Sequence, residues 1–119
     1  MWDNGNDSWN NDGAIRINVN GTDRATNAKK AVSGSAGPVY YTFYVFPNNV
    51  VILYWVASAT TYQYENAFAV YYTNDPPDPA FSPTNNAAVD TSGRLLVYKQ
   101  YNNMNSIADG ATLGTFTVP

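Results

Sequence analysis

A run of carboxylates and amides near the N-terminus is the first feature of the sequence with ligand-binding chemistry. Its members are Asp3, Asn4, Asn6, Asp7, Asn10, Asn11 and Asp12. Calcium takes six to eight oxygen ligands, and the side chains and backbone of a glycine-containing loop supply them. The run is not an EF-hand, because the glutamate that ends an EF-hand loop is missing. We expect a calcium site, and the alternative is a solvated loop whose side chains bond to their own backbone. The expected loop ligands are Asp3, Asn6, Asp7, Asn10 and Asp12.

Four aromatic residues lie in polar stretches of the chain instead of in apolar runs: Trp2, Trp9, Tyr62 and Tyr64. A flat ring beside hydrogen-bonding side chains suits a sugar, because the CH face of the sugar stacks while its hydroxyls find polar partners. We expect these four residues to contact a glycan, with Trp9 exposed beside Tyr62 or Tyr64. The alternative for Trp9 is that it closes one end of the core.

The composition argues against several other functions. The chain has no histidine and no cysteine, so it lacks the usual general base, a thiolate nucleophile and a disulfide framework. Charged residues make up 13% of the 119 residues and the net charge is -3, so no basic surface is available to hold nucleic acid. The single glutamate and the short chain leave little material for a glycosidase cleft. We therefore expect no enzymatic activity.

The length fits a single domain over residues 1–119. No apolar run is long enough to span a membrane, so membrane insertion is not expected. Met1, Trp2 and Asp3 show no basic or apolar leader pattern. Uncharged polar residues with many aromatics are typical of secreted modules. We expect an extracellular or cell-surface protein, in which Met1 is either a true start or a start that remains after removal of a leader, the second being favoured by the secreted character of the composition.

Most of the chain has the residue patterns of β-strands. Ile15, Ile17 and Val19 alternate with polar residues, which predicts a strand with one buried face. Asn20 and Gly21 then form the strongest short turn signal. The segments predicted as strands are residues 14–19, 39–46, 50–56, 67–72, 95–101 and 113–118.

The segments 39–46 and 50–56 are apolar on both faces, which predicts a hairpin that lies centrally between two layers. Residues 22–38 are predicted as a loop, with a short irregular strand near Ala31 and Val32. Residues 75–83 contain four prolines and are predicted as an extended loop.

Short strands at this spacing, with no helix, predict an all-β fold. The expected architecture is an antiparallel β-sandwich of six to eight strands, jelly-roll-like or immunoglobulin-like. The residues expected in its core include Ile17, Val45, Leu53 and Phe68.

Several short motifs resemble a repeated module of bacterial surface and secreted proteins. That module has an Asp-Ser-Trp-Gly-Asp-Gly-Trp-Asn-Gly-like loop, a strand ending in Val-Asn-Gly, a Phe-Thr-Val-like strand and a Glu-Asn-Ser-Phe segment. The corresponding residues here, all within residues 1–75, are 7–13, 15–21, 41–45 and 65–68. Asparagines replace the second tryptophan and the inner glycines of the loop. The resemblance implies a small β-sandwich displayed outside the cell, with the acidic loop near the Glu-Asn segment.

That implied proximity gives Glu65 a role. It is the only glutamate of the chain and is flanked by Tyr64 and Asn66. A glutamate binds calcium through both carboxylate oxygens. We expect Glu65 to complete the calcium site, and the alternative is an ordinary surface charge.

Two functions remain open. The first is a calcium-stabilised, non-catalytic extracellular module that binds a polysaccharide or other glycan, or acts in adhesion. The second is a structural subunit whose copies join into a filament or tube by β-strand addition, with residues 114–119 as the donor strand.

Overall fold

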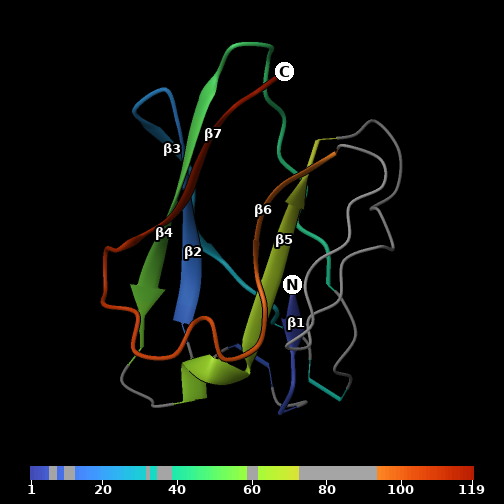
Figure 1. Ribbon diagram of the computed structural model, residues 1–119, viewed down its shortest axis with the longest axis vertical. Coiled ribbons are helices and arrows are strands. Elements are labelled where there is room, and N and C mark those ends of the chain that lie inside the picture. Colours follow the sequence, from blue (N-terminus) through green and yellow to red (C-terminus); the bar gives the residue numbers. More distant parts are fainter. Residues whose placement is uncertain (6–7, 10–12, 32, 35–38, 59–61, 73–93) are drawn as a thin grey trace.

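The structure is a computed structural model that describes residues 1–5, 8, 9, 13–31, 33, 34, 39–58, 62–72 and 94–119. In this part of the chain seven strands form two antiparallel sheets that face each other (Figure 1). The predicted all-β sandwich is therefore confirmed. A one-turn 3-10 helix, η1 (Tyr62–Glu65), precedes one of the strands, although no helix was expected.

The larger sheet has four strands in the order β3-β2-β4-β7. Their bounds are β2 (Gly13–Val19), β3 (Thr22–Ala28), β4 (Val50–Ala57) and β7 (Thr112–Thr117). The central pair β2 and β4 is in register over the whole of β2, from Gly13 opposite Ala57 to Val19 opposite Val51. Residues 114–119 were predicted as a detachable strand, but β7 pairs with β4 and Val118 is buried in the core. The end of this chain is therefore part of its own fold.

The smaller sheet has the order β1-β5-β6. It consists of β1 (Trp2–Asp3), β5 (Asn66–Tyr71) and β6 (Leu95–Lys99). The two residues of β1 pair with Ala67 and Asn66 at the start of β5. Residues 75–83, predicted as a proline-rich loop, lie outside the described residues.

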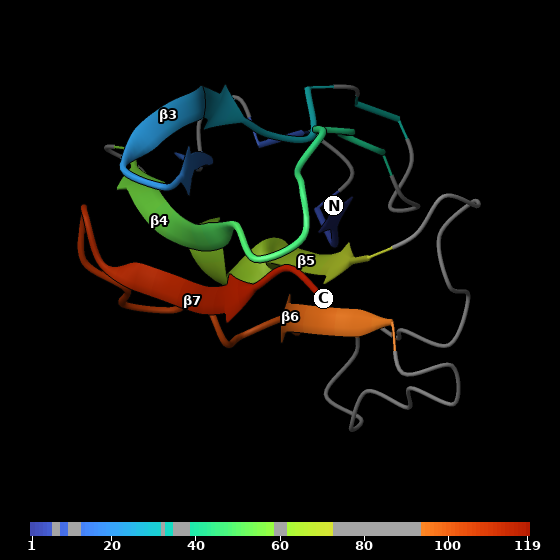
Figure 2. The ribbon, with the colours of Figure 1, turned by 90° about the horizontal axis from the view of Figure 1, so that it is seen from above.

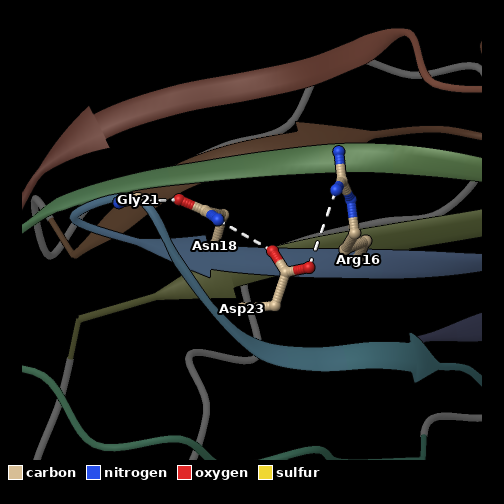
Figure 3. A network of polar contacts seen from close by, with 4 residues as sticks. All are labelled: Arg16, Asn18, Gly21 and Asp23. Carbon is tan, nitrogen blue, oxygen red and sulfur yellow. Dashed lines mark hydrogen bonds and ion pairs between the residues drawn. The ribbon is translucent and has the colours of Figure 1, made fainter.

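The turn between β2 and β3 forms as its sequence predicts. Asn20 and Gly21 have φ angles of 50° and 83°, the positive values that a two-residue hairpin turn requires. Asn18 supports the turn from β2: its Oδ1 accepts from the Gly21 amide at 2.9 Å, and its Nδ2 donates to Asp23 at 2.7 Å (Figure 3). Arg16 forms a 3.6 Å ion pair with Asp23.

Two expectations for the segments beside this hairpin and beside β4 are wrong. Residues 22–28 were predicted as loop but form β3, because β2 offers a hydrogen-bonding edge to a strand too polar to show alternation. Ala31 belongs to no strand, and Val32 lies outside the described residues. Residues 39–46 were predicted as a buried central strand but belong to no strand, and most of their side chains are exposed.

The core lies between the sheets and contains the predicted residues of β2, β4 and β5. Ile17, Leu53 and Phe68 are at most 3% exposed, and Val45 is half-buried against them. On one side β6 and β7 lie next to each other, so the two sheets meet there (Figure 2). Gly114 permits this approach, because a Cβ there would lie 2.5 Å from the side chain of Val97. The described residues contain no helix that is long and apolar enough to cross a membrane.

Candidate functional site

The acidic loop is attached to the smaller sheet through Asp3. The Asp3 side chain is fully buried, and its carboxylate accepts from the amides of Gly5 at 3.1 Å and Ser8 at 2.7 Å. The Asn4 amide donates to the Glu65 carbonyl at 2.9 Å, so the loop begins beside the Glu-Asn segment. Of the six expected calcium ligands, Asn6, Asp7, Asn10 and Asp12 lie outside the described residues. Within the described part of the chain, no three acidic groups come together.

A buried amide lies next to Asp3. Asn66 is the β5 partner of Asp3, is fully buried, and neither its Oδ1 nor its Nδ2 has a hydrogen-bond partner among the described residues. The pKa of the nearby Tyr101 hydroxyl is raised, first by burial and then by the negative charge of Asp3. An unsatisfied buried amide is costly. The side-chain oxygen Oδ1 of Asn66 is therefore available as a metal ligand next to the Asp3 carboxylate.

Trp9 is a core residue, and its predicted role as an exposed sugar contact is wrong. Its side chain is 0% exposed, and its ring meets the edge of Trp55 at a centroid distance of 6.2 Å and an angle of 71°. The indole Nε1 donates to the Trp2 carbonyl at 2.8 Å, so its one polar atom is satisfied inside the fold. The alternative expectation, that Trp9 closes one end of the core, describes its place.

The other three predicted glycan contacts are not assembled into one platform. Tyr62 is 54% exposed on η1, and Tyr64 is half-buried. Their ring centroids lie 6.3 Å apart and the ring planes are inclined by 54°, so the two rings do not share a plane. Trp2 is half-buried and lines a different feature, a groove between the sheets.

This groove has a volume of about 560 Å³. Its floor is formed by core side chains of both sheets, including Ile15, Ile17, Leu53 and Phe116. One wall is the segment 39–45, and the other is the second half of β5. None of the described residues that line the groove has a charged side chain.

Both walls present backbone that no described strand covers. The two residues of β1 pair with Ala67 and Asn66, so the same edge of β5 continues beyond β1, from Phe68 to Val70, where no strand of the described residues pairs with it. In the segment opposite, the backbone bonds to Met1 at Val39 and to Asn49 at Phe46. Residues 40–45, between these two points, form no backbone hydrogen bond with other described residues.

The segment 39–46 also forms an exposed aromatic surface, which we call the aromatic segment. Val39, Phe43 and Val45 are half-buried, and Phe43 and Val45 pack against the core. The rings of Tyr40, Tyr41, Tyr44 and Phe46 are 62%, 47%, 90% and 76% exposed. Exposed apolar surface of this extent is typical of an interaction site.

The amino group of Met1 lies at the base of the groove. It donates to the Val39 carbonyl at 2.9 Å. Its pKa is lowered from 8.0 to about 5, first by burial and then by the positive charge of Lys30. The amine is therefore mainly uncharged at neutral pH, which keeps the groove free of charge.

The groove was not predicted from the sequence. The aromatic residues at 40–46 were visible, but they indicate a buried strand as readily as an exposed one.

Comparison with known proteins finds no matching family model, no matching curated protein and no matching solved structure.

Proposed function

We propose that this chain is a non-catalytic extracellular module that binds its partner by β-strand addition in the groove. The observation that carries the proposal is a groove with an apolar floor, lined on one side by an edge of β5 and on the other by the segment 39–45, whose backbones have no described strand as a neighbour there. An extended peptide bonds to such backbone through its main chain and inserts alternate side chains into the floor. Structural and adhesive subunits join in this way.

The geometry favours a strand over a glycan. A sugar platform through Trp9 is excluded by the burial of that ring, and the Tyr62 and Tyr64 rings are inclined to each other. The groove floor consists of aliphatic and aromatic side chains, and no charged side chain is present there to bind the hydroxyls of a sugar. The extracellular location rests on the composition and on the resemblance to bacterial surface modules.

Calcium remains part of the proposal as a stabilising ion. Asp3 and Glu65 are the two expected ligands that lie among the described residues. The side-chain oxygen Oδ1 of Asn66, beside Asp3, has no hydrogen-bond partner among the described residues. Calcium takes carboxylate and amide oxygens together. The ion would bind next to β1, and Trp2 of β1 lines the groove.

A peptide array tests strand addition. Dilute protein is applied to immobilised peptides of alternating apolar and polar residues, and to the same peptides with N-methylated backbones. Binding to the first set and loss on N-methylation is the expected result, because N-methylation removes the backbone donors that pair with a strand edge. In parallel, retention on cellulose, xylan, chitin and β-glucans is measured. Glycan retention without peptide binding would replace this proposal with the glycan-binding function, and binding of neither would overturn it.

A further inference from the structure

Asn20 and Gly21, at the tip of the β2–β3 hairpin, form a pair that can react with itself. The backbone nitrogen of Gly21 can attack the side-chain Cγ of Asn20, because glycine has no side chain to hinder the approach. In this step the nitrogen loses its proton and bonds to Cγ, the Cγ–Nδ2 bond breaks, and ammonia leaves. Water then opens the five-membered imide at either carbonyl. The product is aspartate or isoaspartate, in which the main chain runs through the former side chain.

The folded hairpin holds both reacting groups in other hydrogen bonds. The Gly21 amide donates to Asn18 Oδ1 at 2.9 Å (Figure 3). The Asn20 Oδ1 accepts from the Val50 amide at 2.8 Å, so this side chain is directed toward β4. Asn18 is a neutral amide, and its oxygen holds the Gly21 proton in place without removing it. The attack on Cγ therefore requires that both hydrogen bonds open first.

The hairpin lies at an edge of the larger sheet, where such opening is easiest. Among the described strands, only β2 pairs with β3. Most side chains of β3 are exposed, and Ala28 at its far end is the buried one. Local opening of an edge costs less free energy than unfolding of the core. The tip can therefore open while β2 and β4 stay paired.

The modification would change the turn in which it occurs. Asn20 and Gly21 have φ angles of 50° and 83° in a two-residue turn, and the length of such a turn sets its geometry. Isoaspartate lengthens the main chain at this point. Either product adds a negative charge near Asp23, which pairs with Asn18 in the same hairpin. The modified form should hold β3 less firmly than the original chain does.

We infer that Asn20 is a deamidation site whose rate is set by opening of the β2–β3 tip, with Asn18 as the residue that keeps the Gly21 amide from reacting. The reaction needs only water besides the chain itself. It does not depend on what the groove binds, so its test is separate from that of the proposed function.

The first test compares folded and unfolded wild-type protein. Both are incubated in mildly alkaline buffer, one of them in concentrated urea, and are then cleaved after arginine. Residues 17–24 are released as one peptide, and fragmentation in a mass spectrometer assigns the acid to Asn18 or Asn20. Asn18 should remain intact, because the branched side chain of Val19 hinders the equivalent attack. Asn20 should react about tenfold or more slowly in the folded protein, as expected for two net hydrogen bonds.

Two variants test the role assigned to Asn18. Asn18→Ala removes the acceptor for the Gly21 amide and should raise the deamidation rate of folded Asn20 by about two- to tenfold. Asp23→Ala is the matched control. It removes the Asn18 Nδ2 contact and the Arg16 ion pair but keeps Asn18 Oδ1, so its rate should stay close to that of the wild type. Asn4–Gly5 is the same dipeptide elsewhere in the chain, and its rate should not respond to either variant.

Hydrogen exchange of the Gly21 amide provides a second readout, because exchange also requires release of this amide from Asn18. Exchange and deamidation should be accelerated together in Asn18→Ala. Deamidation of Asn20 at the same rate in folded and unfolded wild type would overturn the inference. It would also be overturned if Asn18→Ala left the rate unchanged, if Asp23→Ala raised it equally, or if Asn4 accelerated along with Asn20.

Discussion

The backbones of Met1 and Val39 form two reciprocal hydrogen bonds, each 2.9 Å long. This pair links the first residue of the chain to the start of the aromatic segment. It also marks the level at which β1 stops while β5 continues. The groove begins at this pair, and no described strand pairs there with the edge of β5 that β1 uses.

The burial of Trp9 predicts a large loss of stability on truncation. Trp9→Ala should lower the free energy of unfolding by roughly 3–5 kcal/mol, because it removes a fully buried ring that packs on Trp55. Thr26→Ala is the control: this side chain is exposed on β3, and its removal should change stability by no more than about 0.5 kcal/mol. Urea denaturation followed by fluorescence or circular dichroism measures both. Equal midpoints for Trp9→Ala and wild type would mean that the ring is not in the core.

Gly13 lies where β2 passes the Trp55 ring. It has a φ of 134°, and a Cβ at this position would collide with Trp55 and with the Val56 carbonyl. Gly13→Ala should therefore cost roughly 1–3 kcal/mol from overpacking, in addition to backbone strain. Gly21→Asn should be tolerated, because Gly21 has open space around it and asparagine accepts a positive φ. The melting temperatures of the two variants test this contrast, and a Gly13→Ala protein as stable as Gly21→Asn would contradict it.

The Met1 amine should make stability depend on pH. Its pKa is about 5 in the folded chain and 8.0 as the reference value, so between these values the unfolded chain binds more protons. Stability is therefore full above pH 8, falls as the pH is lowered toward 5 and levels off below it. The loss attributable to this group is on the order of 1–4 kcal/mol.

An N-acetylated protein provides the matched control for this titration. Acetylation removes the titrating amine but keeps an amide donor for the Val39 carbonyl. Chemical denaturation of both forms between pH 5 and pH 8 should show a steeper pH dependence for the free amine. Identical slopes would show that the amine is not buried as described.

Calcium should stabilise the fold. An ion that binds only the native state at a hundredfold excess over its Kd adds about 2.7 kcal/mol to the free energy of unfolding. Melting should rise by several degrees in millimolar calcium and fall with a chelator, and Asp7→Ala and Asp12→Ala should each abolish the shift. Asp23→Ala, which removes an exposed carboxylate of the β2–β3 hairpin, should keep it. A melting temperature unchanged by calcium would contradict the metal site.

The strands with local signals were predictable from the sequence. The alternation of Ile15, Ile17 and Val19 places β2 with its apolar face in the core, and Asn20-Gly21 forms the expected turn. The segments that became β4, β5, β6 and β7 were also recognised, with ends displaced by a few residues. These features depend on side-chain periodicity and on backbone preferences, which the chain carries in its local order.

Other features depend on what the fold places opposite each residue. Trp9 stands among polar residues, yet the fold brings Trp55 against it. β3 is polar, yet it pairs because β2 offers an edge. Residues 39–46 have the composition of a buried strand, but no strand among the described residues pairs with them. The exposed aromatic segment and the groove were therefore decided by tertiary structure alone, because backbone pairing and burial are properties of neighbours that are distant in the sequence.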